Sequence, residues 1–575
     1  MTYTLGLNFL HSDSSACIFE NGILIAAVEE ERFTRVKHTT IFPYNSINFC
    51  LKKKDLDISQ IDFITVNTNP LSSLWHKIFF ISKNLKSLPV AFGSIKNSSK
   101  KYNLKQYVNK IDNNKKFSGE IKFIDHHESH IASSLFFNEF DECVNLSVDG
   151  FGDFASCGWG FSKNKDLKID KKIYFPHSLG IFYQAMTQFL GFKNYGDEYK
   201  VMGLSSYGKP KYVDLINKLI KKKKEGFELN LEYFSHHKKK ILTINNNGQA
   251  IYRDLYSNKL IDLLGQDRKK NEKITQDHMD LAKSTQVVYE NVFFTVLNNL
   301  YEKYKCENLS LSGGCAMNSV ANGKIIKNTS FKKIYISPNP GDAGGAIGSA
   351  CVHVSKNLKK KINVKNYAYL GPKFENKEIE KFIDKNSNIK KYQVSFFNDE
   401  EISNIISKKL TESKIIGWFQ NKTEWGPRAL GNRSIIADAR NPNIKDIINS
   451  KIKRRESFRP FAPSILFEKT QDWFEIENEV PFMSEVYPIK KDKRTLLPGI
   501  THIDGTGRLQ TIKKVNNLKY YNLINSFYKL TGIPIILNTS FNENEPIVNT
   551  PEEAFNCFDR TDMDLLVIGN YIISR

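Results

Sequence analysis

Short apolar runs alternate with stretches of helical spacing over residues 1–350, a pattern that predicts an α/β domain. The first run, Thr4–Phe9, leads into a polar turn, and two more runs follow at Ala16–Glu20 and Ile23–Val28. Only Asn21-Gly22 separates the last two, and this dipeptide is typical of a tight hairpin turn. We therefore expect a hairpin at one edge of the first domain, with a polar loop between its first two strands.

The same pattern divides the chain into two predicted domains. The first covers residues 1–355, within which the lysine- and asparagine-rich region 205–275 is expected to be a surface insertion. Residues 356–368 begin with a lysine-rich stretch and are the predicted linker. Beyond them, residues 369–575 form a second α/β segment. The sequence shows no internal repeat.

Length and composition are those of a globular protein with more than one domain. The chain has 575 residues, of which 40% are hydrophobic and 12% aromatic, so extended disorder is not expected. No window approaches the roughly 18–20 apolar residues of a membrane span, and Met1–Leu10 lacks the features of a secretory signal. The eight cysteines are scattered without a Cys-x-x-Cys pair, which favours reduced thiols and a cytoplasmic location.

The chain is strongly basic, with a net charge of +21 and a pI near 9.3. Much of the excess lies in lysine runs such as Lys221–Lys224 and Lys238–Lys240. Such a balance is found in proteins that bind nucleic acids or anionic surfaces. A nucleic-acid partner is nevertheless not expected, because the sequence contains no recognised binding module and no aromatics interleaved with the basic residues. Solvated loops are the simpler explanation of the lysines, and charge does not decide the function.

Two histidines provide the clearest candidate chemistry. His126 and His130 are four residues apart, so on a helix both imidazoles lie on one face, where they could bind a divalent metal. A zinc peptidase motif is excluded, because a second histidine would have to stand at position 131, which is Ile131. A structural pair held by hydrogen bonds is an equally good explanation of this segment on its own.

Three glycine-rich turns in the first domain point to a nucleotide cleft. Glycines at such turns let phosphate oxygens approach backbone amides, and a following helix N-terminus adds favourable partial charge. One turn begins with Asp149, and another contains Asp342. We expect both carboxylates to join the histidines, which gives the candidate metal ligands His126, His130, Asp149 and Asp342. The candidate nucleotide-binding residues are Gly150, Gly152, Gly313, Gly314 and Asn318.

These residues and several further motifs resemble one family, the O-carbamoyltransferases that include nodulation protein U and the tobramycin and cephamycin carbamoyltransferases. The resemblance runs nearly end to end. Its motifs are Gly6-Leu7-Asn8 with His11-x-Asp13, Glu29-Glu30-Glu31-Arg32-Phe33, His126-x-x-x-His130, the segments 196–204, 311–314, 341–344, 424–434 and 454–463, and Leu537-Asn538-Thr539-Ser540-Phe541-Asn542. So many motifs in order specify the family, but they do not specify the acceptor.

The resemblance implies a fold and a reaction. The first domain would be similar to the tRNA threonylcarbamoyl transferases and to the sugar kinase/Hsp70/actin superfamily, and the second to threonylcarbamoyl-adenylate synthases. In this family the second domain joins carbamoyl phosphate to ATP, giving carbamoyl-adenylate, pyrophosphate and phosphate. The first domain then passes the carbamoyl group to a hydroxyl of a sugar, glycan or secondary metabolite. A homodimer is the family expectation.

The resemblance also implies roles for residues of the first domain. Its iron site falls on the four candidate ligands, a set that does not distinguish Fe(II) from another divalent metal; Mg²⁺ is a further candidate cofactor. A sugar hydroxyl is a poor nucleophile, so we expect His11 to act as base or proton relay and Asp13 to orient the hydroxyl. Many members have these two residues adjacent, whereas Ser12 separates them here. Lys200 would neutralise phosphate or pair with a carboxylate.

The second domain must bind the negative charges of carbamoyl phosphate and ATP. Arginine suits this task because its guanidinium binds phosphate in a bidentate manner. The candidate residues are Arg428, Arg433, Lys453, Arg459, Arg508 and Asn538. Arg454 and Arg455 are as well explained by surface ion pairs.

Three rival functions are less consistent with the sequence. The tRNA threonylcarbamoyl transferases resemble residues 1–350 only, and this chain has a complete second domain. Hydrogenase-maturation carbamoyltransferases carry Cys-x-x-Cys zinc motifs and an acylphosphatase-like segment, and neither is present. A non-catalytic nucleotide-binding scaffold should have lost ligands, whereas all four metal positions are retained.

Overall fold

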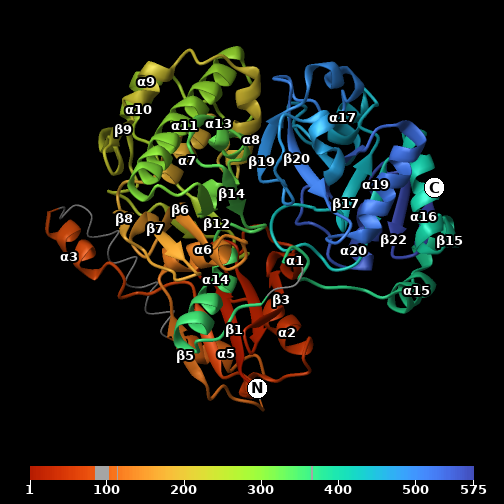
Figure 1. Ribbon diagram of the computed structural model, residues 1–575, viewed down its shortest axis with the longest axis horizontal. Helices are drawn as coiled ribbons and strands as arrows, with labels where there is room; N and C mark the ends of the chain where they lie inside the picture. Colours follow the sequence, from red (N-terminus) through yellow and green to blue (C-terminus); the bar gives the residue numbers. More distant parts are fainter. Residues whose placement is uncertain (84–102, 113, 364–366) are drawn as a thin grey trace. The chain divides into compact units, whose positions relative to one another are not determined.

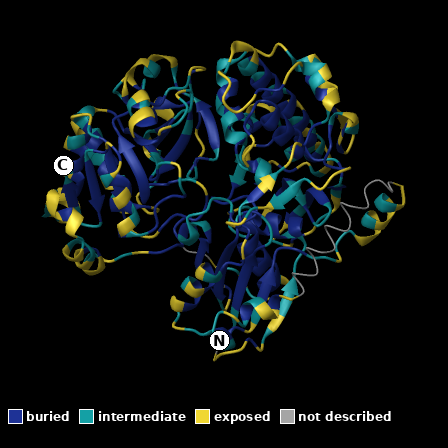
Figure 2. Cartoon of the chain, turned by 180° about the vertical axis from the view of Figure 1, so that it is seen from behind, coloured by how far each residue is buried: buried dark blue, intermediate teal, exposed yellow. Residues whose placement is uncertain are grey.

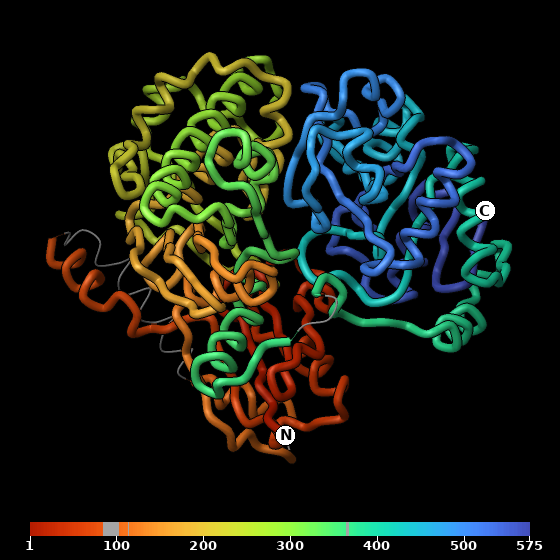
Figure 3. Tube along the Cα trace, viewed as in Figure 1, coloured from red at the N-terminus to blue at the C-terminus, as the bar shows by residue number. Residues whose placement is uncertain are grey.

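The computed structural model describes residues 1–83, 103–112, 114–363 and 367–575. The chain forms two compact units, Met1–Lys365 and Asn366–Arg575, and the path of each can be followed by colour in Figure 3. The division between them falls within the predicted linker 356–368. Among helices of the described ranges, none combines the length and apolarity needed to cross a membrane.

The first sheet of the first unit has the strand order β3-β2-β1-β4-β5. Its strands are β1 (Tyr3–Asn8), β2 (Ser15–Glu20), β3 (Ile23–Glu29), β4 (Phe63–Val66) and β5 (Glu120–Phe123). Strands β1 to β3 are antiparallel neighbours, and β4 and β5 continue parallel to β1. The predicted hairpin is confirmed, and Asn21 and Gly22 have the positive φ values, 49° and 86°, that its two-residue turn requires.

The second sheet repeats this topology with the order β8-β7-β6-β13-β14. Its strands are β6 (Glu142–Gly152), β7 (Ala155–Lys163), β8 (Lys171–Tyr174), β13 (Asn308–Ser312) and β14 (Lys333–Ile336). Here too the first three strands are antiparallel and the last two parallel to the first. The two sheets thus share one strand order and one pattern of parallel and antiparallel neighbours, although the sequence shows no internal repeat. The two five-stranded sheets confirm the predicted α/β class for this unit.

Two helices join the halves of the first unit. Helix α6 (His126–Leu135) follows β5, and α14 (Gly344–Val352) follows β14, so they hold equivalent positions, and Figure 1 shows them side by side. They can approach closely because Gly348 has no side chain: a Cβ at this position would lie only 1.8 Å from the carbonyl oxygen of Ser129. This approach brings the loops that follow β5, β6 and β14 to one place.

The remaining helices of the first unit flank the sheets. They are α1 (Glu31–Thr34), α2 (Tyr44–Lys52), α3 (Leu74–Lys83), α5 (Leu104–Val108), α7 (Leu179–Phe189), α8 (Glu198–Leu204), α9 (Val213–Asn217), α10 (Asn258–Leu264), α11 (Gln276–Tyr304), α12 (Ser319–Asn322) and α13 (Ile325–Asn328). The region predicted as an insertion contains two hairpins, formed by β9 (Ile220–Lys223) with β10 (Gly226–Leu229) and by β11 (Leu242–Ile244) with β12 (Ala250–Tyr252).

The second unit is a nine-stranded sheet with the order β15-β23-β22-β16-β17-β21-β18-β20-β19. Its strands are β15 (Gln393–Phe396), β16 (Ile416–Phe419), β17 (Arg433–Ala437), β18 (Ala462–Leu466), β19 (Glu485–Pro488), β20 (Thr506–Ile512), β21 (Ile535–Ser540), β22 (Leu565–Ile568) and β23 (Tyr571–Ser574). The central strands are buried along their length, as the dark blue arrows of Figure 2 show. The predicted α/β class is confirmed for this unit as well.

Helices cover both faces of this sheet. They are α15 (Asn376–Lys385), α16 (Asp399–Thr411), α17 (Ile444–Ile447), α18 (Thr470–Trp473), α19 (Leu518–Thr531) and α20 (Pro551–Asp559). Alternate sheet residues enter different cores: Ile435 packs with residues of α17 and α20, and Ile436 with residues of α16 and α19. This alternation follows from the two-residue period of a strand.

Candidate functional site

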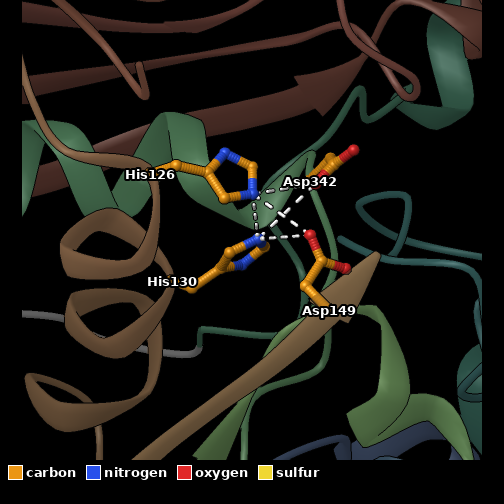
Figure 4. A group of neighbouring side chains, drawn as sticks. All are labelled: His126, His130, Asp149 and Asp342. Carbon is orange, nitrogen blue, oxygen red and sulfur yellow. Dashed lines mark hydrogen bonds and ion pairs between the residues drawn. The ribbon is translucent and has the colours of Figure 1, made fainter. Parts of the chain in front are cut away.

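Four side chains of the first unit converge on one point: His126 and His130 from helix α6, Asp149 from the end of strand β6, and Asp342 from the loop before α14 (Figure 4). His126, His130, Asp149 and Asp342 each offer one ligand atom, these atoms lie within 4.8 Å of one another, and all four residues are buried. The Nε2 atoms of His126 and His130 are 3.0 Å apart, and Asp149 Oδ2 lies 3.1 Å from His126 Nε2. Asp342 Oδ1 lies 3.5 Å from His130 Nε2 and 3.6 Å from His126 Nε2. The structure thus brings the four predicted ligands together.

Local sequence explains how the histidines are held. Asp125 caps α6, because its side chain accepts hydrogen bonds from the backbone N–H groups of His127 and Glu128 at 3.1 Å each. His126 and His130 then project from successive turns of the helix. Gly152 makes room for the first ring, since a Cβ at that position would lie 2.0 Å from His126 Cδ2.

The arrangement fits a divalent cation. An ion with bonds of about 2.1 Å places neighbouring ligand atoms roughly 3.0–3.4 Å apart, close to the spacings found here. Among the described residues, Asp342 Oδ1 is buried without a hydrogen bond of good geometry, and a bound cation would balance its charge. Burial alone would lower the pKa of His130, but the nearby carboxylates of Asp149 and Asp342 raise it to about 10. Two carboxylates facing two imidazoles therefore form an anionic centre that requires positive charge.

His11 lies directly behind this cluster. Its Nδ1 is 2.7 Å from Asp342 Oδ2, and its ring centroid is 5.3 Å from that of His126. His11, the predicted base or proton relay, is thus in contact with one of the candidate metal ligands.

Asp13 has a different partner, which the sequence did not identify. Its Oδ1 lies 2.7 Å from Nδ1 of His38, and the charge of Asp13 raises the pKa of His38 to about 9 against the opposing effect of burial. Glu31 completes this group, accepting a hydrogen bond from the His38 backbone N–H at 3.1 Å. The sequence offered one indication of this group. Glu31 belongs to the motif Glu29-Glu30-Glu31-Arg32-Phe33, and His38 follows it after only seven residues.

Two tyrosines extend this wall of the site. The ring of Tyr195 meets His38 edge-on at 5.1 Å and stacks on Tyr252 at 5.4 Å with an interplanar angle of 13°. Tyr252 ends β12, so the region predicted as an insertion contributes a residue here. The β11–β12 hairpin is attached at its turn, where the Thr40 N–H donates to the Gly248 carbonyl at 2.8 Å.

The predicted nucleotide-binding residues lie at the end of strand β6 and in the turn that follows β13, next to the cluster. The Gly314 N–H donates to Asp149 Oδ1 at 2.9 Å, and Gly313 has a φ of 86°, which side chains rarely adopt. Gly150 borders open space, with nothing within 4 Å of a Cβ built there. Asn318 caps α12 by accepting from the Ala321 N–H at 3.1 Å.

Lys200 pairs with a carboxylate of its own segment. Its Nζ lies 3.1 Å from Asp197 Oδ1, and the pair is largely buried. Its predicted role in neutralising phosphate or pairing with a carboxylate of the cleft stays a prediction.

In the second unit, the structure brings four arginines together. Burial, together with the charges of Arg428, Arg455 and Arg459, lowers the pKa of Arg508. Arg508 Nε is buried without a hydrogen-bond partner among the described residues. The Arg459 guanidinium also lies 3.7 Å from Glu456 Oε2. Such a group of guanidinium ions suits an anion with several charges. Arg455, for which the sequence suggested a surface ion pair as an equally good explanation, belongs to this group.

Three other predicted residues of the second unit are bound to its backbone. Arg433 is fully buried over the Phe419 ring at 3.6 Å and donates to backbone carbonyls, among them Asn432 at 3.0 Å. Lys453 Nζ donates to the Asn542 carbonyl at 2.8 Å. Asn538 Nδ2 donates to the Ala429 carbonyl at 3.2 Å, which fixes the turn that carries Arg428. The structure does not place Arg433 and Lys453 with the arginine group.

Comparison with known sequences agrees with the division of the chain into two units. The family described as Carbamoyltransferase N-terminus matches residues 3–351, and Carbamoyltransferase C-terminus matches residues 407–575. The chain belongs to the carbamoyltransferase family. The resemblance inferred from the motifs is thereby confirmed, and so is the prediction of a carbamoyltransferase.

Relatives of this carbamoyltransferase cover nearly its whole length. An uncharacterized protein of Synechocystis sp. is 38% identical over all of this chain and 97% of its own. Nodulation protein NolNO of Sinorhizobium fredii is 34% identical over 99% of this chain and 79% of its own. Among solved structures, HypF of T. kodakarensis is similar over 62% of this chain and 48% of its own. The identity is 14% and the TM-score is 0.33, so the likeness is remote.

Proposed function

We propose that this carbamoyltransferase uses ATP and carbamoyl phosphate to carbamoylate a hydroxyl group, with activation in the second unit and transfer in the first. The observation that carries the proposal is the separation of two sites of opposite character. One is the buried cluster of two imidazoles and two carboxylates, and the other is the group of arginines around Arg508. The first suits a cation and the second a polyphosphate.

Activation needs a site that binds two highly charged anions together. Arg428, Arg455, Arg459 and Arg508 would neutralise the phosphates of carbamoyl phosphate and ATP. Water would release carbamate and phosphate from carbamoyl phosphate, and attack of carbamate on the α-phosphate of ATP would then give carbamoyl-adenylate and pyrophosphate. Asn538, Lys453 and Arg433 would support this site by fixing the loops around it.

Transfer needs a held electrophile and a deprotonated hydroxyl. A divalent ion bound by His126, His130, Asp149 and Asp342 would supply Lewis acidity and charge for the adenylate phosphate. His11, held by Asp342, would take the proton of the attacking hydroxyl, and AMP would leave. Gly150, Gly313 and Gly314 would let the nucleotide approach the backbone.

The acceptor would enter beside the pair formed by Asp13 and His38. The charge of Asp13 raises the pKa of His38 to about 9, and the contact between the two fixes the Asp13 carboxylate, which could accept a hydrogen bond from the acceptor hydroxyl. Tyr195 and Tyr252 border the same space and offer ring edges and phenol groups to a sugar, glycan or other polyhydroxylated acceptor.

The decisive experiment measures pyrophosphate release from ATP with and without carbamoyl phosphate, in the absence of an acceptor. We expect release that depends on carbamoyl phosphate. Replacing Arg508→Ala should reduce it roughly 100-fold, because a charge-assisted contact to phosphate is lost. His130→Ala should leave it nearly unchanged while it abolishes transfer.

Arg454→Ala is the matched control, since Arg454 is exposed and paired on the surface with Glu543 at 3.1 Å. It should retain wild-type release. If Arg508→Ala and His130→Ala reduced pyrophosphate release equally, the assignment of the two half-reactions to separate units would be wrong.

A further inference from the structure

The first turn of helix α6 is capped by two carboxylates that come from different halves of the first unit. A helix leaves the backbone N–H groups of its first turn without an intrahelical partner. Asp125, the residue before the helix, accepts from those of His127 and Glu128. The N–H of His126 donates instead to Asp153 Oδ2 at 2.9 Å. A residue 27 positions further along the chain thus holds the backbone of a candidate metal ligand.

Asp153 also holds the loop that follows β4. Its Oδ1 accepts from the Thr68 hydroxyl at 2.6 Å, and its Oδ2 accepts from the Asn69 N–H at 2.7 Å as well as from His126. A carboxylate oxygen has more than one lone pair, so one oxygen can serve two donors. The loop after β4 and the start of α6 both follow strands of the first sheet, and Asp153 ties them to a turn of the second.

The turn between β6 and β7 presents this carboxylate. Gly152 pairs with Ala155 across the turn. Asp153 and Phe154 are therefore its two residues, and their φ values are 50° and 71°. Asn-Gly and Asp-Gly are the usual pairs in such a turn, and phenylalanine is unfavourable in this left-handed region. A strained turn persists only where surrounding contacts fix it, and the hydrogen bonds of Asp153 are among those contacts.

Residues 149–153 supply three parts of the candidate metal centre. Asp149 is a ligand, Gly152 leaves room for the His126 ring, and Asp153 holds the His126 backbone. Figure 4 shows the side chains of α6 and Asp149 meeting at one point. Because Asp149 and Asp153 belong to one hairpin, the hydrogen bonds of Asp153 also fix the distance between Asp149 and the imidazoles of α6. A displacement of α6 from β6 would separate ligand atoms that one cation must bridge.

We propose that Asp153 is a positioning residue of the candidate metal centre. It sets the place of His126, and through α6 that of His130, relative to Asp149. Hydrogen bonds behind the ligands of a metal site commonly change its affinity by about 10- to 100-fold when they are removed. The inference rests on the metal centre of the proposed function, and it adds the residue that joins the two elements carrying three of the ligands.

Asp153→Gly tests the proposal without straining the turn, because glycine adopts a φ of 50° freely. The full chain is stripped of metal and titrated with Co(II), whose visible absorption bands report the arrangement of its ligands. We expect the variant to bind Co(II) roughly 10- to 100-fold more weakly and with altered bands. Fe(II) content after anaerobic loading, measured by elemental analysis, should fall in parallel.

Asp153→Asn separates hydrogen bonding from charge. The amide oxygen can take the place of Oδ2 and accept from both N–H groups, and the amide nitrogen can donate to the Thr68 hydroxyl, which also accepts. This variant should therefore keep the wild-type bands and an affinity within about threefold of the wild type. If it bound Co(II) as weakly as Asp153→Gly, the charge of Asp153 would be the cause and the positioning role would be wrong.

Asp57→Ala is the matched control for the loss of a helix cap. Asp57 caps the short helical turn Ile58–Gln60, where it accepts from the Ser59 N–H at 2.8 Å. It precedes β4, whereas Thr68 follows that strand, so the two lie at opposite ends of it. The control should lower the thermal stability of the first unit and leave Co(II) affinity unchanged.

The outcomes separate this inference from the proposed function. Wild-type affinity and bands in Asp153→Gly would overturn the role of Asp153 and leave the metal centre standing. A wild-type chain that bound neither Co(II) nor Fe(II) would overturn the metal centre and this inference together. Pyrophosphate release dependent on carbamoyl phosphate tests the second unit, and it should be the same in the wild type and in all three variants.

Discussion

At the scale of single residues, the candidate metal centre depends on Gly152 as well as on its four ligands, because only a residue without a side chain leaves room for the His126 ring. Gly152→Ala would place a methyl group 2.0 Å from the His126 ring, so we expect the ring to be displaced and metal content to fall at least about tenfold. Gly150→Ala is the matched control two residues away, where a Cβ meets nothing within 4 Å. Elemental analysis of both variants after loading with Fe(II) measures the difference. Equal metal content in the two would contradict this account of His126.

At the scale of one element, strand β19 carries a buried acid with a role in stability. Burial raises the pKa of Glu485 to about 7, from about 4.3 in an unfolded chain. Between these values the folded state keeps a proton that the unfolded state loses, so stability should fall as pH rises from about 4.5 to 7, by up to ~1.4 kcal/mol per pH unit, and level off above.

Glu485→Gln removes this titration while it keeps an acceptor for the Tyr487 hydroxyl, with which Glu485 is hydrogen-bonded. Calorimetry of the second unit's transition should therefore show the variant gaining stability over the wild type as pH rises toward 7. Parallel pH profiles for the two proteins would mean that Glu485 titrates normally when folded.

At the scale of the whole molecule, the two units should respond differently to metal removal. Dialysis against a chelator should stop carbamoyl transfer, because the cluster of His126, His130, Asp149 and Asp342 would lose the cation that we propose it binds. Pyrophosphate release dependent on carbamoyl phosphate should persist when Mg²⁺ is restored alone, because the arginine group needs no resident metal. Equal loss of both activities that only Fe(II) reverses would contradict the division of labour.

Local structure was largely determined by the sequence. The hairpin of β2 and β3 follows from Asn21-Gly22, and the pairing of His126 with His130 follows from the helical period once Asp125 caps α6. These features depend on neighbours a few residues away, so the sequence displays them directly. The ordered motifs likewise identified the family, and with it the four candidate ligands.

Contacts between distant segments were decided only by the tertiary structure. His11 meets Asp342 across 331 positions, and Asp13 is bonded to His38, so residue types alone could not divide their roles. Arg433 and Arg508 look alike in the sequence, yet one guanidinium is bound to backbone carbonyls and the other faces three arginines. The environment that distinguishes them is built by strands far apart in the chain.

The same limit applies to whole elements. The two five-stranded sheets of the first unit share one strand order, although the sequence shows no repeat. Strand order is defined by which backbones pair, and the identity of the side chains does not display it. The apolar spacing of α3 is equally typical of a helix that faces a core, and only its contacts with Tyr174 and Phe175 turn that face outward. The sequence by itself thus determined the family, the local elements and the chemistry available. The fold decided which of those groups meet, because burial and charge act through space and not along the chain.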